Sequence, residues 1–73
     1  MWKSAVKDWP DDDLPVAVWE RDRLAIAKRV GSIWYECSEY GDVHMSNGGG
    51  PIMCEPEKWC HLPARLVKLK RTK

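Results

Sequence analysis

Three short segments rich in β-branched and aromatic residues constrain the fold of this chain most strongly. They comprise residues 15–20 (PVAVWE), 24–27 (LAIA) and 33–37 (IWYEC). The polar tetrapeptide 20–23 separates the first two segments, and Gly31, which adopts a positive φ at little steric cost, separates the second from the third. This pattern predicts an antiparallel meander over residues 15–38. We therefore expect a mainly β fold, or an α+β fold with little helix.

Side chains alternate between the two faces of a strand, so each segment should turn one set of residues inward. A chain of 73 residues has a small core, and large indole side chains are one way to fill it. The sequence has no Phe but five Trp, at positions 2, 9, 19, 34 and 59. The alternative use of these indoles is an exposed platform for bases or a peptide. The expected core comprises at least three of the Trp together with Val16, Val18, Leu24, Ile26, Ile33 and Tyr35.

Residues 13–29 admit a second interpretation, because their apolar side chains also recur at nearly helical spacing. The β-branched residues, the polar break at 20–23 and Gly31 favour the hairpin over the helix.

The segments on either side of the meander are less regular. Residues 2–7 are expected to form a short first strand or an extended lead-in, and residues 8–15, with two prolines and an Asp run, a loop. A long Gly-rich loop is expected near residues 41–51, where the triple Gly lacks the Lys-Ser/Thr of a phosphate-binding loop. Short strands at 43–45 and 51–54 would flank it. We assign residues 1–63 to one small β domain and residues 64–73 to a basic tail.

The net charge of +1 is a sum of two opposite contributions. Residues 1–60 hold seven Lys/Arg and eleven Asp/Glu, which gives 7 − 11 = −4, and residues 61–73 hold five Lys/Arg and no acid, which gives +5. The tail suits binding to phosphates, whereas the acidic body opposes it, and a solvated tail or one docked on the body is the alternative. The candidate partner-binding residues are acids in the loops and bases in the tail: Asp11, Asp12, Asp13, Glu39, Asp42, Arg65, Lys68, Lys70 and Arg71.

Five side chains could bind Zn²⁺ or form a Cys–His catalytic pair: Cys37, Cys54, Cys60, His44 and His61. Cys54 and Cys60 are six positions apart, which is not the spacing of a zinc ribbon, and the adjacent Cys60 and His61 would point to opposite faces of a strand. An odd number of cysteines favours reduced thiols. We therefore expect no metal, no cofactor and no enzymatic activity, and a small zinc-binding domain remains as an alternative.

A series of landmarks runs along the chain: Trp2, Trp9-Pro10, residues 14–19, residues 24–27, residues 31–35 and the closing motif Trp59-x-x-Leu62-Pro63. Their order resembles that of a family of small phage and prophage proteins that carry a domain of unknown function. The chain departs from the family in having Lys58 and Cys60 where His and Met are usual, and in its longer basic extension. The resemblance implies an accessory protein of phage origin and brings no catalytic residues with it.

From these observations we predict a non-enzymatic accessory protein that binds a protein or complex of the bacterial host, for example as an inhibitor in host takeover or anti-defence. The N-terminal residues lack the apolar stretch of a signal peptide, and no apolar run approaches the ~20 residues of a membrane span. The expected location is the bacterial host cytoplasm. The alternatives are a nucleic-acid-binding module that uses the basic tail, and the zinc-binding domain.

Overall fold

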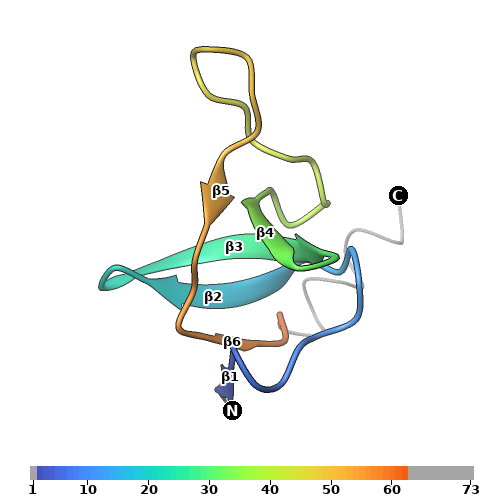
Figure 1. Cartoon of the computed structure of the whole chain (residues 1–73), viewed down its shortest axis with the longest axis vertical. Helices are drawn as coiled ribbons and strands as arrows, with labels where there is room; N and C mark the ends of the chain where they lie inside the picture. The colour runs from blue at the N-terminus through green and yellow to red at the C-terminus, as the bar shows by residue number, and fades with distance from the viewer. Residues whose placement is uncertain (1, 63–73) are drawn as a thin grey trace.

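In the computed structural model, which describes residues 2–62, one antiparallel sheet of six strands organises the chain (Figure 1). No helix occurs among these residues. The expected mainly β fold is therefore confirmed. The strands are β1 (Lys3–Ser4), β2 (Val16–Glu20), β3 (Arg23–Val30), β4 (Ile33–Glu36), β5 (Met53–Cys54) and β6 (Lys58–Cys60), and their order in the sheet is β1-β6-β2-β3-β4-β5.

Strands β2, β3 and β4 form the predicted meander. The β2–β3 register runs from Val16↔Ala27 to Glu20↔Arg23, so the hairpin interpretation is confirmed and the helical one is excluded. Two residues close this hairpin, and both have positive φ, 52° at Arg21 and 60° at Asp22, as a type I′ turn requires. Gly31, with φ of 65°, opens the second turn.

The core prediction is right for β2 and wrong for β3 and β4. Val16 and Val18 are fully buried, but Leu24 is 63% exposed and Ile33 is 42% exposed. Directly opposed residues of antiparallel strands share a face, so the pairs Val16↔Ala27 and Val18↔Ala25 turn the alanines of β3 inward. Leu24, Ile26, Ile33 and Tyr35 consequently lie on the outer face of the sheet, the last two by alternation with the buried Trp34.

The alanines face inward because indole rings fill the space above them. Trp34 and Trp59 are 6% and 2% exposed and belong to one buried cluster with Ala27 and the two valines of β2. Small and bulky residues together fill such a core without strain. The expectation of at least three buried Trp is wrong, since Trp2 and Trp9 are exposed and Trp19 is half-buried.

The last of the six described strands, β6, lies inside the sheet, where it pairs with both β1 and β2 (Figure 1). On the outer face, the Lys58 ammonium lies 5.4 Å from the ring centroid of Trp2 and 5.9 Å from that of Trp19. On the inner face, the Trp59 indole N–H donates a hydrogen bond to the carbonyl of Asp8. Strand β6 thus fixes the N-terminal segment to the meander.

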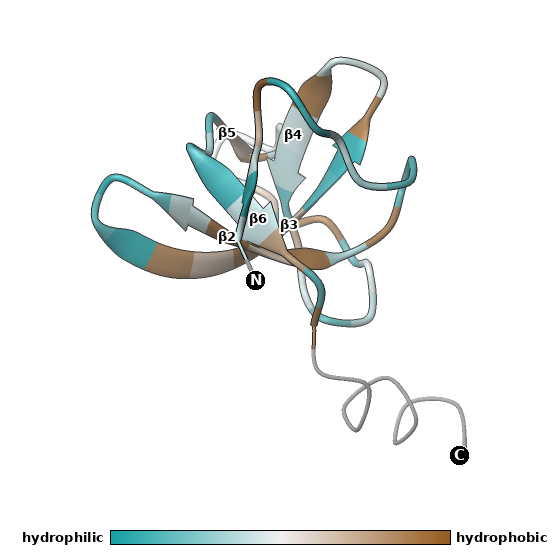
Figure 2. Ribbon diagram, turned by 90° about the horizontal axis from the view of Figure 1, so that it is seen from below, coloured by the Kyte–Doolittle hydropathy of each residue, from teal (hydrophilic) through white to brown (hydrophobic). Residues whose placement is uncertain are grey.

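Long connections carry much of the exposed apolar surface, and Figure 2 shows hydrophobic residues on them as well as on the strands. The predicted strand at 43–45 is present only as isolated bridges, Cys37↔Val43 and Met45↔Pro51. These bridges lie in the loop between β4 and β5, which projects from the sheet in Figure 1. Among residues 2–62, nine large apolar side chains are 40% or more exposed. Exposed apolar residues that are scattered singly are ordinary, so only those that lie together indicate a binding surface.

Candidate binding groove

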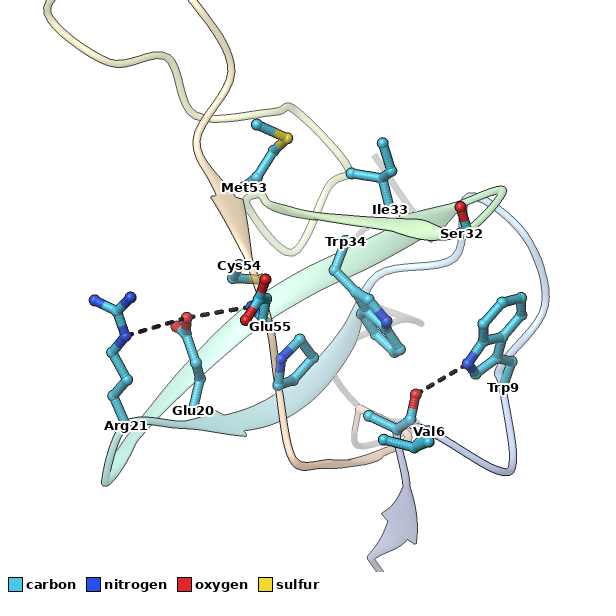
Figure 3. A pocket seen from close by; sticks show the side chains of 12 residues that line it. Val6, Trp9, Glu20, Arg21, Ser32, Ile33, Trp34, Met53, Cys54 and Glu55 are labelled. Carbon is cyan, nitrogen blue, oxygen red and sulfur yellow. Dashed lines mark hydrogen bonds and ion pairs between the residues drawn. The ribbon is translucent and has the colours of Figure 1, made fainter.

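An open groove of about 600 Å³ runs between the segment after β1, the start of β4 and the residues that follow β5 (Figure 3). The β2–β3 turn closes one end of it. The lining residues are Ala5, Val6, Trp9, Glu20, Arg21, Ser32, Ile33, Trp34, Met53, Cys54, Glu55 and Pro56.

Apolar side chains make up the walls of this groove. Trp34 is buried, and Figure 3 shows its indole pointing into the groove between Glu20 on one side and Trp9 on the other. Val6 is 78% exposed and Trp9 is 47% exposed. A ligand in the groove would therefore remove apolar surface from water.

Trp9 is held in position from two directions. Its indole N–H donates a 2.9 Å hydrogen bond to the carbonyl of Ala5. The guanidinium carbon of Arg29 lies 4.6 Å from the centroid of the Trp9 ring, within the range of a cation–π contact. Arg29 is itself fixed, because its guanidinium donates to Asp12 and to the carbonyls of Pro10 and Gly31. The indole is thus placed before any ligand binds.

Glu20 brings a negative charge to the end of the groove at the β2–β3 turn. Its side chain is only 8% exposed, and its Oε2 accepts a 3.3 Å hydrogen bond from the Glu55 N–H. The nearest cations are more distant, with Arg21 Nε at 4.0 Å from Oε2 and Arg23 Nη2 at 3.7 Å from Oε1. Arg23 makes its close ion pair with Glu36 instead. The charge of Glu20 is therefore only loosely paired.

Cys54 lies in the groove as a neutral thiol. Burial, together with the negative charges of Glu20 and Glu36, raises its pKa to about 12. A thiol with this pKa is almost entirely protonated at neutral pH and is a weak nucleophile. Because Cys54 is a weak nucleophile, the groove is suited to binding a ligand through apolar contacts and charge.

Two of the predicted partner-binding acids have a structural role. Asp12 accepts hydrogen bonds from Arg29 and from the Gly31 N–H, at 3.0 and 2.9 Å. Asp13 lies 2.8 Å from the Lys28 ammonium, and this hydrogen bond raises the pKa of Lys28 above its usual value. Both acids fasten the loop at 8–15 to β3 and to the turn that follows it.

The other predicted residues do not meet in one place. Asp11 and Asp42 are exposed, and Glu39 lines a separate hollow beside β3. None of the five predicted acids lines the groove. The four basic candidates, Arg65, Lys68, Lys70 and Arg71, lie outside the described residues.

Glu20 is not among the predicted site residues, although the sequence carries a signal for it. Residues 16, 18 and 20 alternate along one strand, so Glu20 shares the inner face with two fully buried valines. An acid at the end of a buried stripe indicates a carboxylate held in a partly desolvated place. The prediction of a polar turn at residues 20–23 did not take into account that Glu20 continues the inward face of β2.

Across residues 2–62, no three His, Cys, Asp or Glu side chains are grouped so that they could hold a metal ion. The same residues contain no helix that is long and apolar enough to cross a membrane. No protein-family model, no curated protein and no solved structure matches the chain. The resemblance to phage proteins therefore stays a prediction, and the case for a function rests on the groove.

Proposed function

We propose that this chain is a non-enzymatic binding domain that docks on a protein of the bacterial host through the groove. The observation that carries the proposal is an open groove with an indole at its base and exposed apolar side chains on one wall. Trp34 forms the base, and Val6 and Trp9 line the groove and are exposed. Ile33 and Met53 border it, with side chains that leave the opposite face of the sheet. In keeping with the resemblance, we place this activity in an accessory protein of phage origin that acts in the host cytoplasm.

The shape and composition of the groove favour a protein ligand. Aromatic residues dominate the energetics of protein interfaces, and here one indole forms the base while another stands at the rim. The groove is open along its length, so that a segment of polypeptide fits it better than a small molecule that must be enclosed. A positioned Trp9 also lowers the conformational entropy that binding would otherwise lose.

The two alternative functions have less support in the described residues. Binding of nucleic acid would have to overcome the charge of residues 1–60, which is 7 − 11 = −4. The basic residues proposed for that role lie outside the described chain. A zinc site has no cluster of ligands within residues 2–62.

Affinity capture from a bacterial lysate tests the proposal when it is done with matched variants. Val6→Glu places a charge in the groove at a highly exposed position, and Leu24→Glu places the same charge at a similarly exposed position on the outer face. We expect a host protein to be retained by the wild type and by Leu24→Glu and to be lost with Val6→Glu. Both substitutions should change stability by no more than about 0.5 kcal/mol.

Two results would contradict the proposal. One is a set of captured proteins that Val6→Glu and Leu24→Glu reduce equally. The other is recovery of nucleic acid alone, with binding that weakens steeply as salt is raised, which would favour the nucleic-acid alternative.

A further inference from the structure

Building on the proposed function, we infer that the groove recognises a basic side chain in a segment of the partner protein. The arginine or lysine cation would pair with the Glu20 carboxylate, and the apolar neighbours of that residue would pack against Trp34 and Trp9. The inference rests on the burial of Glu20, on its incomplete pairing and on the walls around it.

The Glu20 carboxylate has acceptor capacity to spare. A carboxylate has about four acceptor positions. Within the described chain, Oε2 accepts one hydrogen bond and Oε1 accepts none, and Oε1 is not among the buried unpaired atoms, so water reaches it. The Arg21 and Arg23 guanidiniums lie 4.0 and 3.7 Å away, beyond hydrogen-bond distance, so a ligand cation can displace that water and pair with Oε1 directly. A cation entering the groove would supply the missing partner.

The surroundings of Glu20 make the groove favourable to cations and unfavourable to anions. Glu55 adds a second carboxylate to the lining, against a single cation, Arg21, which is almost fully exposed. Burial is the main cause of the raised pKa of Cys54, and among the charges near it those of Glu20 and Glu36 raise the pKa more than that of Arg23 lowers it. Charge complementarity of this kind selects a basic ligand and excludes an acidic one.

The walls suit the rest of a basic side chain. Arginine and lysine carry an apolar stem behind the charged group, and that stem packs on apolar surface while the tip reaches a carboxylate. The faces of indole rings also attract cations. In Figure 3 the Glu20 carboxylate and the Trp9 ring lie on opposite sides of the Trp34 ring, so the charged and the apolar parts belong to one groove.

A library of random heptapeptides on beads, selected with the full-length chain, tests this inference without assuming a ligand. We expect peptides with one or more Arg or Lys flanked by apolar residues to be enriched with the wild type. Glu20→Gln should abolish the preference for basic residues and weaken a selected peptide about tenfold, as expected for loss of a charged hydrogen bond. Glu39→Gln, which removes an acid outside the groove, should leave both unchanged.

Amide NMR spectra of the wild type and of Glu20→Gln complete the test. A dispersed spectrum of the variant shows that it folds, and we expect the shift changes to be confined to the groove. If the variant does not fold, Glu55→Gln at the exposed rim replaces it, with a smaller expected loss of affinity. Shifts in residues 64–73, which have the same apolar and basic chemistry, would identify the occupant as the chain's own C-terminal segment and overturn the inference.

The outcomes separate the inference from the proposed function. Two results would overturn the inference and leave the groove as a protein-binding site. The first is enrichment of peptides that Val6→Glu abolishes but that show no preference for basic residues. The second is a preference for basic residues that survives Glu20→Gln. Absence of any enrichment sensitive to Val6→Glu counts against both.

Discussion

Replacement of Arg29 by lysine should destabilise the domain far more than its conservative chemistry implies. Lysine keeps the charge but loses the planar fork that lets one guanidinium contact several acceptors. Here that fork reaches the Asp12 carboxylate and the carbonyls of Pro10 and Gly31, and it lies over the Trp9 ring. A single ammonium cannot reproduce all four contacts.

The magnitude follows from which contacts are buried. Asp12 is more than half exposed, so its ion pair contributes about 0–1 kcal/mol. The bond to the carbonyl of the buried Pro10 is worth about 1.5–3 kcal/mol, because its loss leaves a buried acceptor without a donor. Against this, Arg29 Nε is buried with no partner in the described chain, and its removal returns about 1 kcal/mol. The expected net loss for Arg29→Lys is about 2 kcal/mol.

Urea unfolding followed by tryptophan fluorescence measures this loss. With a slope near 1 kcal/mol per molar for so small a domain, the unfolding midpoint should fall by about 2 M. Asp12→Asn, which removes only the exposed ion pair, should lower it by no more than about 1 M. Arg21→Lys is the matched control, since its side chain is 87% exposed, and its midpoint should not move by more than about 0.5 M.

A midpoint for Arg29→Lys within about 0.5 M of that for Arg21→Lys would refute the reasoning. It would show that the hydrogen bonds of Arg29 do not fasten the loop at 8–15 to the sheet. A loss in Asp12→Asn as large as that in Arg29→Lys would also refute it, because the ion pair would then account for the whole effect.

Further predictions concern backbone strain, thiol reactivity and packing. Gly31→Ala should lower the free energy of unfolding, measured by thermal unfolding, by about 1–2 kcal/mol; the positive φ alone accounts for this, since no atom lies within 4 Å of the added Cβ. Gly50→Ala, in equally open space without a positive φ, should be neutral or stabilising. At pH 8, iodoacetamide should modify Cys60 well before Cys54, and a Cys54 thiol that reacts as fast as Cys60 would contradict this. Because folding raises the pKa of Cys54 to about 12 from 9.0, its contribution to stability is full below pH 9 and is lost as the pH rises towards 12. Val18→Ala should lower the free energy of unfolding by roughly 2–3 kcal/mol, and a loss under 1 kcal/mol would show that the site collapses around the cavity.

The sequence predicts the elements of this fold better than it predicts their faces. Turn chemistry at 20–23 and at Gly31 is local, so the meander could be read from the chain directly. Which face is buried depends on what covers it. Leu24 is more hydrophobic than Ala25, yet Ala25 packs against the core, because Trp34 and Trp59 arrive from other strands and occupy the volume that a leucine would need.

The candidate site was harder to predict for a similar reason. The groove is assembled from residues 5–9, 20–21, 32–34 and 53–56, which are brought together only by the sheet. The run of acidic residues predicted Asp12 and Asp13 as partner-binding residues, but their carboxylates form ion pairs with Arg29 and Lys28 within the fold. A count of acids cannot separate those that fasten a loop from one, such as Glu20, whose charge is left loosely paired.

The position of β6 also sets the order in which the domain can assemble. Strand β1 is the first of the six strands, but within residues 2–62 it pairs only with β6, more than fifty residues later. The β2–β3–β4 meander is made of local pairings and can form early, whereas the docking of β6 closes a long loop and draws β1 in with it. Mutations in the β2–β3 hairpin should therefore slow folding, while mutations in β1 should mainly accelerate unfolding. During synthesis, the Trp34 ring and the inner face of β2 stay uncovered until Trp59 has been made.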